Sequence, residues 1–334
     1  MEKSNKVSQK FSIILPVRNG GHLIKNCVAS ILAQSYQNFN LLILENKSTD
    51  GTFEWLKTIT DNRVIILPSE YPMSIEENWS RIKDIPKNEF ITLIGHDDVM
   101  DEHFLEEMSG LIERFPAASL YLSHYSFIDQ NGKALTPCKP LKGHYSPAEF
   151  TKAILELKIE PIGAVVRSSD YDKAGGIPPY PNLLFADYAL WISLASVSSA
   201  VVHPGRLFSY RIHLSTSKTT PASRYIDALF DFLQFLQMQS GKDDGIKSAI
   251  LETAPGFIRF YCQSLSLRLL KTPFAKRDNK TVDSFVSACR EWAQKFSGTL
   301  SASRLTKLAV LIDKSVMLSN VYLILRNISK RKTI

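Results

Sequence analysis

The sequence of 334 residues predicts an α/β fold: a mostly parallel, Rossmann-like sheet flanked by helices, with a C-terminal helical region. Two observations support this fold class. Short apolar runs, which are typical of buried strands, alternate with segments of helical periodicity up to about residue 127. From residue 224 onward the apolar residues follow helical spacing only. A third observation concerns function: polar loops follow several of the predicted strands, and in parallel sheets ligands bind beyond the carboxyl ends of the strands.

The elements of the first part are predicted from apolar runs that are bounded by turn residues. Their alternation is typical of βαβ units, in which a parallel sheet is covered on both faces. The predicted strands cover residues 11–17, 41–44, 64–67, 90–94 and 119–127. The predicted helices cover residues 21–35, 53–59, 74–84 and 102–114.

The pattern becomes mixed after residue 128. Asp129–Gly132 has the composition of a hairpin turn. Helices are then expected over residues 145–157 and 186–197, and strands over residues 162–166 and 207–213. The later amphipathic helices are expected to break near Gly241, Pro255 and Pro273.

Charge is distributed unevenly along the chain. The 40 Lys and Arg against 33 Asp and Glu give a formal net charge of +7. Residues 221–334 hold 18 basic and 9 acidic side chains, whereas residues 1–220 are nearly neutral. We therefore predict two regions with different partners: a nearly neutral domain over 1–220 and a basic helical region over 221–334. Basic surface can contact nucleic acid, anionic lipid or an acidic substrate, or can simply be a solvated helical face.

Composition also predicts where the protein works. The four cysteines are widely spaced and form no C-x-x-C pair, which argues against a zinc site or a disulfide framework and favours a reducing cytoplasm. Residues 1–10 lack the apolar stretch of a secretory signal. No uncharged apolar run of about 18 residues is present, so no membrane-spanning helix is expected.

The carboxylate pair Asp97 and Asp98 follows the predicted strand 90–94. Adjacent carboxylates repel each other and lose hydration unless a cation or hydrogen-bond donors lie nearby. Divalent cations prefer such oxygen ligands together with substrate phosphates. The pair is therefore a candidate metal site for a nucleoside diphosphate. The alternative is that one of the two carboxylates caps the helix that follows.

Three further segments carry candidate residues. Glu45 and Asn46 end a predicted strand and can bind a base or ribose, whereas the turn at 48–52 favours a structural role. Asp187 begins a predicted helix, where it can be an N-cap or a general base for an acceptor hydroxyl. His213 ends a predicted strand, where it can be structural or a further metal ligand.

In this order, the segments resemble the family 2 glycosyltransferases of the GT-A fold. ILPVRN at 14–19 is similar to that family's opening strand and its PVYN loop, and ASILAQSY at 29–36 to its first-helix signature. ENKSTDGT at 45–52 resembles DDGSTDGT, and HDD at 96–98 resembles the DxD-type metal motif. ADYALW at 186–191 resembles EDxxLW, and YRIH at 210–213 resembles YRxH. The resemblance covers roughly residues 10–218.

The resemblance implies transfer of a sugar from a nucleoside-diphosphate sugar to a hydroxyl of a glycan or lipid-linked acceptor, with inversion at the anomeric carbon. The favoured donor is a UDP-sugar. It implies a divalent cofactor, Mn²⁺ or Mg²⁺, held by Asp98 with help from His213. Asp187 would be the base, and Asp97 would contact the donor. Gly95 stands where many members have a further Asp. The expected nucleotide-sugar contacts are Pro16, Val17, Arg18, Asn19, Glu45, Asn46 and Asp97.

Two rival functions share part of the pattern. A sugar-phosphate nucleotidyltransferase would need a richer glycine and arginine loop than Arg18–Gly21 provides, and an inactive binding module would have lost Asp98 or Asp187. A nucleic-acid partner is not expected, because it leaves the acidic loops unexplained. An oligomer is left open.

The basic apolar stripe of residues 305–324 either packs as a helix or lies on an anionic membrane. The expected location is cytoplasmic, with peripheral attachment to the cytoplasmic face of the membrane as an option.

Overall fold

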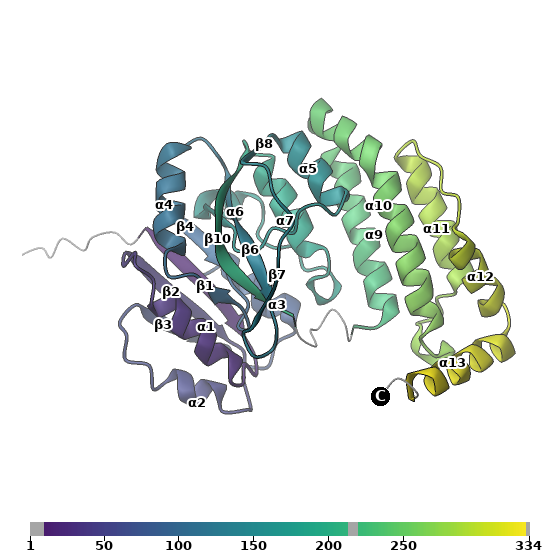
Figure 1. The fold of residues 1–334 in the computed structure, drawn as a ribbon, viewed down its shortest axis with the longest axis horizontal. Coiled ribbons are helices and arrows are strands. Elements are labelled where there is room, and N and C mark those ends of the chain that lie inside the picture. Colours follow the sequence, from purple (N-terminus) through teal and green to yellow (C-terminus); the bar gives the residue numbers. More distant parts are fainter. Residues whose placement is uncertain (1–9, 213–219, 332–334) are drawn as a thin grey trace, which may run out of the picture. The chain divides into compact units, whose positions relative to one another are not determined.

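The computed structural model describes residues 10–212 and 220–331, which form two compact units (Figure 1). The first unit comprises the chain up to Phe150, residues 159–179 and the segment from Ala186 to the end of the last strand. The second unit comprises residues 151–158, residues 180–185 and the helices that follow residue 220. The domain boundary placed at residue 220 from the sequence stays a prediction.

Four parallel strands form one half of the sheet in the first unit (Figure 1). In spatial order they are β3 (Val64–Pro68), β2 (Phe39–Glu45), β1 (Phe11–Val17) and β4 (Phe90–Leu93). Parallel neighbours need crossover connections, and helices supply them here. These are α1 (Leu23–Leu32), α2 (Thr52–Leu56), and α3 (Ile75–Ser80) with the 3₁₀ turn η1 (Arg81–Lys83). The sequence predicts each of these elements, and only their ends differ.

The other half of the sheet mixes strand directions. β9 (Val165–Arg167) lies antiparallel between β4 and β6 (Leu120–Ile128), and β6 pairs in parallel with β10 (Ala200–Arg211). The short strands β5 (Val99–Met100), β7 (Ala134–Pro137) and β8 (His144–Tyr145) are antiparallel partners of β10 or β6. The remaining helices before residue 200 are α4 (Phe104–Arg114), α5 (Pro147–Leu155), α6 (Ser168–Lys173) and α7 (Ala186–Ala195), with the 3₁₀ turn η2 (Pro181–Leu183).

Strand β10 begins seven residues before the strand predicted at 207–213. Pro204 and Gly205 interrupt the apolar pattern and so indicate a turn in the sequence. In the structure the strand continues through them, and its register against β6 shifts between His203 and Arg206 and again before Phe208. A bulge of this kind accommodates a proline that cannot donate to the ladder.

Burial on both faces explains the continuous apolar runs of the parallel strands. Every residue of β1 is buried. Successive strand residues point to opposite faces, so Phe11, Ile13 and Leu15 share one core with residues of α1 and α4, while Ile14 is buried on the other face. Polar groups are therefore concentrated where the strands end, and the candidate site lies there.

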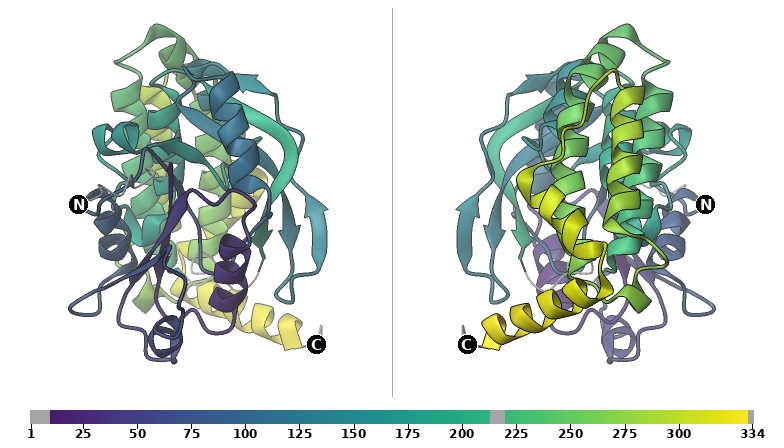
Figure 2. Two further views of the ribbon diagram at one scale, coloured as in Figure 1. Left: turned by 90° about the vertical axis from the view of Figure 1, so that its left-hand side faces the viewer. Right: turned by 90° about the vertical axis from the view of Figure 1, so that its right-hand side faces the viewer.

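The second unit is helical. α9 (Ala222–Gln239), α10 (Asp244–Leu270) and α11 (Val282–Lys295) lie side by side, with the 3₁₀ turn η3 (Phe274–Lys276) between the last two (Figure 1). α12 (Arg304–Asp313) and α13 (Val316–Arg331) follow, and α13 runs across the direction of the other helices at one end of them (Figure 2). Within the described residues, no helix is both long enough and apolar enough to span a membrane.

The helix break predicted at Pro255 is wrong, because α10 runs from Asp244 to Leu270 without interruption. Proline removes one helical hydrogen bond. Packing keeps the helix continuous here: Ala254 and Phe257 are buried, and the Pro255 ring lies so close to Gly298 that a Cβ there would overlap it. The breaks expected near Gly241 and Pro273 correspond to the ends of α9 and α10.

Candidate functional site

The loops that follow β1 and β2 are locked together by side chains of the turn at 48–52. The backbone N–H groups of Asn19, Gly20 and Gly21 donate to Ser48 Oγ (2.9 Å), Thr52 Oγ1 (3.0 Å) and Asp50 Oδ2 (2.9 Å), respectively. Hydroxyl and carboxylate oxygens are the usual acceptors for loop N–H groups. The turn therefore has the structural role that its sequence favours, and it fixes the loop that carries part of the expected nucleotide-sugar contacts.

The expected contacts from β1 have different environments. Pro16 and Val17 are buried in the strand, and Arg18 is exposed, with Nη1 3.4 Å from the carbonyl oxygen of Met73. Asn19 adopts a positive φ of 56°, and its Oδ1 accepts the N–H of Thr49 at 2.8 Å. Among these four expected nucleotide-sugar contacts, Arg18 is the residue whose side chain is both charged and exposed.

Glu45 and Asn46 are almost completely buried, at 1% and 2% exposure. The Glu45 carboxylate accepts the N–H groups of Lys47 (3.2 Å) and Ser48 (2.7 Å). The Asn46 side chain donates to the carbonyl oxygen of Met73 (3.0 Å) and accepts its N–H (2.8 Å). Both side chains hold neighbouring backbone, and their contact with a nucleoside stays a prediction.

The carboxylate of Asp98 is buried at the edge of the sheet, with the residue 6% exposed. Its Oδ1 accepts the backbone N–H of Arg211 at 2.9 Å. Loss of hydration, together with the negative charge of Asp97, raises the pKa of Asp98 well above its ordinary value, although Arg211 opposes the shift. Keeping Asp98 ionised in this position therefore costs free energy that a nearby cation would offset.

Gly95 makes room for both carboxylates. A Cβ at Gly95 would lie 2.7 Å from Asp97 Oδ1 and 3.4 Å from Asp98 Oδ2. Both side chains therefore direct an oxygen toward the same side of the Gly95 backbone. The absence of a side chain at this position, which departs from the family pattern, is what allows this arrangement.

Helix α1 supports the backbone on either side of the acid pair. Ser30 Oγ accepts the N–H of Met100 at 3.1 Å, and Cys27 Sγ lies 3.4 Å from the carbonyl oxygen of Gly95. The fully buried Gln34 donates to the carbonyl oxygen of Asp101 and accepts the N–H of Leu105 at 2.9 Å. These contacts give a physical reason for the first-helix signature at 29–36, to which the sequence assigns no role.

Asp187 lies in the first turn of α7. The residue is exposed, yet protein atoms surround its carboxyl closely enough that lost hydration raises the pKa to about 6. Hydrogen bonds from the backbone N–H groups of Tyr188 and Asp187 itself oppose the shift, and the negative charge of Glu160 adds to it. A carboxyl with a pKa near 6 is mostly ionised at neutral pH and is still basic enough to take a proton.

Tyr210, which the sequence does not single out as a site residue, lies within electrostatic range of the acidic residues. Burial raises its pKa to about 12, and the negative charges of Asp98, Asp97, Glu160 and Asp187 add to the shift in that order. All four carboxylates are thus near enough to one phenol to act on it electrostatically. The structure brings together residues that are separated by up to 113 positions in the sequence.

Three more residues of this cluster were missed from the sequence. Arg211 is buried and is bonded to the acid loop, but the family motif directed attention to His213 instead. Glu160 accepts a hydrogen bond from Tyr125, which is buried in β6. Tyr125 appears in the sequence as an ordinary apolar strand position, and Glu160 follows a helix with no motif of its own. Neither residue carries a local signal that would have identified it.

Of the two metal ligands expected from the sequence, the structure describes Asp98. His213 lies outside the described residues. Among the residues that the structure does describe, no three His, Cys, Asp or Glu side chains are placed to hold a metal ion. The oxygen donors that fit a hard divalent cation are the two carboxylates of Asp97 and Asp98.

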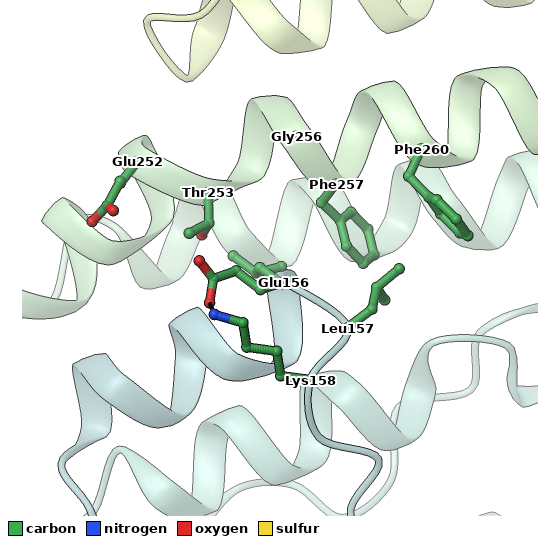
Figure 3. Close-up of a pocket in the computed structure, with 9 residues that line it drawn as sticks. Glu156, Leu157, Lys158, Glu252, Thr253, Gly256, Phe257 and Phe260 are labelled. Atoms are coloured by element: carbon green, nitrogen blue, oxygen red, sulfur yellow. Dashed lines mark ion pairs between the residues drawn. The ribbon is translucent and has the colours of Figure 1, made fainter. Parts of the chain in front are cut away.

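A cavity of about 380 Å³ lies in the second unit, between the end of α5 and the middle of α10 (Figure 3). Glu156 and Lys158 form an ion pair of 2.6 Å at its side, and Glu252 pairs with Lys152. Phe257, Phe260 and Leu157 supply apolar surface. None of the residues predicted to form the site lines this cavity.

Comparison with known proteins identifies the first part of the chain. Residues 12–160 match the family model described as glycosyl transferase family 2. Glycosyltransferase GlyG of Streptococcus pneumoniae is 27% identical over 128 residues, which cover 38% of this chain and 42% of GlyG. The Escherichia coli UDP-Glc:alpha-D-GlcNAc-diphosphoundecaprenol beta-1,3-glucosyltransferase WfgD is 24% identical over 231 residues, or 67% of this chain and 86% of WfgD. The match with GlyG thus spans less than half of that relative's length.

Solved structures show the same fold. S. aureus TarS superimposes with a TM-score of 0.60 and 12% identity over 90% of this chain and 50% of TarS. TarS 1–349 in complex with UDP-GlcNAc gives a TM-score of 0.56 with 13% identity, covering 85% and 92% of the two chains. The mannosyltransferase PcManGT of Pyrobaculum calidifontis, in complex with GDP-Man and Mn²⁺, gives 0.52 with 12% identity over 96% of this chain and 88% of PcManGT.

The GT-A-like α/β fold and the family resemblance predicted from the sequence are therefore confirmed. The ordered motifs and the matching family model agree: residues 12–160 of the chain form a glycosyl transferase family 2 domain.

Proposed function

We propose that the protein transfers a sugar from a nucleoside-diphosphate sugar to a hydroxyl group of a glycan or lipid-linked saccharide, with inversion at the anomeric carbon. The single observation that supports this most strongly is that the negative charges of Asp98, Asp97 and Asp187 all help to raise the pKa of the same buried phenol, Tyr210. In this proposal Asp97 and Asp98 serve the leaving group, and Asp187 serves the acceptor.

Asp187 acts as the general base in this proposal. Its carboxylate takes the proton from the acceptor hydroxyl while that oxygen forms a bond to the anomeric carbon. The bond from this carbon to the diphosphate oxygen breaks, and its electron pair leaves with the nucleoside diphosphate. Attack from the side opposite the leaving group inverts the anomeric carbon. Proton transfer to a positioned base typically contributes about 10²–10⁴-fold to the rate.

Asp98 and Asp97 are the residues that would hold a divalent cation, Mn²⁺ or Mg²⁺. The raised pKa of Asp98 and the convergence of both carboxylates beside Gly95 fit an oxygen-ligand site of this kind. Such a cation supplies positive charge that stabilises a departing diphosphate. A ligand role for His213 remains part of the proposal, and the remaining ligands would come from the diphosphate and water.

A UDP-sugar is the first donor to test, and a lipid-linked saccharide is the first acceptor. WfgD is named for UDP-Glc and a diphosphoundecaprenol acceptor, and TarS 1–349 was solved with UDP-GlcNAc, whereas PcManGT was solved with GDP-Man. Uracil is thus the base in two of these three relatives. A cytoplasmic location stays a prediction.

Thermal unfolding with added nucleotides tests the donor and the metal together. We expect UDP and UDP-sugars with Mn²⁺ to raise the melting temperature, and EDTA to remove most of the shift. Asp98→Ala should abolish the metal-dependent part. Asp187→Asn should keep the shift while losing transfer to an acceptor. Absence of stabilisation by any nucleoside diphosphate or nucleotide sugar would contradict the proposed function.

A further inference from the structure

The last two described helices both carry several exposed apolar side chains. On α12 they recur every three residues, and on α13 they continue along the helix; Leu311 is 64% exposed and Met317 is 74% exposed. Scattered exposed apolar residues are ordinary, but a contiguous group on neighbouring helices marks an interaction site. We call this group the α12–α13 apolar surface: Leu305, Leu308, Leu311, Met317, Leu318, Val321 and Ile324.

A different face of α12 packs within the second unit. Thr306, Ala309 and Asp313 are buried on that face. Asp313 pairs with the fully buried Arg277 and accepts the N–H of Val282 at 2.7 Å. The α12–α13 apolar surface is therefore left over after the helix has made its internal contacts.

Basic residues outnumber acidic ones along this part of the sequence. From Trp292 to Ile334 the sequence contains eight Lys and Arg and a single acidic residue, Asp313. Because Asp313 is buried against Arg277, it presents no negative charge to a partner. Arg304, Lys307 and Lys314 are exposed and adjoin the apolar residues in sequence, and the Lys314 ammonium lies 4.0 Å from the Asp283 carboxylate.

Apolar side chains bordered by lysine and arginine are the arrangement that inserts into the boundary of an anionic lipid surface. Each Lys or Arg near such a surface contributes to binding, and the apolar side chains contribute by burial. A second copy of this chain fits less well. An isologous interface would bring the same basic residues of both copies together, where they repel.

We propose that the α12–α13 apolar surface, with its basic border, docks the protein on an anionic membrane surface. The occupant is the lipid boundary itself, reached by the side chains of α12 and α13 without a spanning helix. Docking here does not depend on the transfer reaction, so vesicle binding and donor binding can fail separately.

Co-sedimentation with lipid vesicles tests the proposal on the full chain. The probes are vesicles of phosphatidylcholine alone and of phosphatidylcholine with phosphatidylglycerol. We expect binding to the anionic vesicles that is about ten-fold or more stronger than to the neutral ones, and that weakens at high salt. No binding to anionic vesicles, or equal binding to both at low and high salt, overturns the proposal.

Two variants separate the apolar and the charged contributions. Leu305→Ser/Leu308→Ser/Leu311→Ser should lower partition onto anionic vesicles by about ten-fold or more. Lys307→Glu/Lys314→Glu should lower it by a similar factor. This second variant changes only exposed charges and so keeps the test valid if the first folds poorly. Met238→Ser/Val197→Ser, which replaces exposed apolar residues outside the surface, should bind like the unaltered protein.

The competing partners give distinct outcomes. Light scattering that shows a dimer lost in the triple serine variant, with vesicle binding unchanged, would assign the surface to a second copy and overturn membrane docking. Unaltered vesicle binding by both variants would also overturn it. Loss of vesicle binding in both variants, with UDP-dependent stabilisation retained, is the result we expect.

Discussion

Arg211 donates its backbone N–H to Oδ1 of Asp98 at 2.9 Å, while its guanidinium holds the adjacent backbone, with Nε 2.7 Å from the carbonyl oxygen of Asp97. The same guanidinium reaches the carbonyl oxygens of Asp129 (2.8 Å) and Gln130 (3.2 Å) through Nη1. One buried side chain at the end of β10 thereby joins the acid loop to the β6–β7 turn. The position of Asp98 thus depends on a residue that is not itself expected to touch the donor.

Replacement of Arg211 by Lys should disrupt the site more than its conservative character suggests. A lysine keeps the charge but lacks the planar fork that serves several carbonyl groups at once. We expect a loss of about 1–3 kcal/mol in the free energy of unfolding, because buried carbonyl groups lose their donors. Metal-dependent stabilisation by UDP should also weaken. Urea denaturation and thermal shift measure the two effects.

The exposed Arg206 on the same strand provides the matched control for Arg211. Arg206→Lys should leave both the unfolding free energy and the UDP effect unchanged. If Arg211→Lys behaves in the same way, the guanidinium does not hold the acid loop.

Asp98→Asn should separate stability from function. The pKa of Asp98 is raised in the folded state, so a charged Asp98 is less favourable there than in the unfolded chain. Stability is therefore lost as pH rises from the ordinary Asp pKa toward the folded value, and a neutral side chain removes this loss. We expect the variant without metal to melt at the same temperature or higher at pH 7, while metal-dependent UDP binding disappears. A clearly lower melting temperature would show that the charge of Asp98 stabilises the metal-free fold.

The rate of transfer should follow the ionisation of Asp187. Since its pKa is raised to about 6, the base is ionised above that pH and protonated below it. We expect kcat/KM to fall as pH decreases through about 6, because this ratio reports groups of the free enzyme. Asp187→Asn should remove activity across the whole range.

Glu160 provides a check on this assignment, because its negative charge contributes to the raised pKa of Asp187. Glu160→Gln should move the acid limb of the kcat/KM profile to lower pH. A limb that stays in place, or moves upward, would show that a different group titrates.

The parallel half of the sheet and its helices were predictable because apolar runs and helical periodicity are visible within each short segment of sequence. β1 is buried on both faces, so its apolar run is continuous, and the helices between the strands have clear periodicity. β10 was predicted too short and α10 was predicted as broken, because Pro204 and Pro255 carry the sequence signal of an interruption. In both cases tertiary packing overrides that signal: a register shift on β6 absorbs Pro204, and Gly298 packs on Pro255.

The order of the motifs identified the acidic site residues, but it did not identify the residues that hold them or their loops in place. Asp97, Asp98 and Asp187 were found because they follow predicted strands or begin a helix. Gln34 lies within a recognised motif, but its contact with Leu105 spans 71 positions and has no trace in local sequence. Glu160 and Tyr125 meet only through the fold. Residues that act by long-range hydrogen bonds therefore remained outside the prediction.

Gly95→Ala should change the site without much change in the fold. The φ angle of Gly95 is not in the left-handed region, so alanine introduces no backbone strain there. Its Cβ would instead lie 2.7 Å from Asp97 Oδ1, and the Asp97 side chain must move away. Because the displaced atom ends a side chain, we expect less than about 1 kcal/mol of lost stability. Metal-dependent UDP stabilisation and transfer should fall far more. Gly110→Ala, where a Cβ meets open space, is the control, and equal effects of the two substitutions on UDP binding would contradict the assigned role of Gly95.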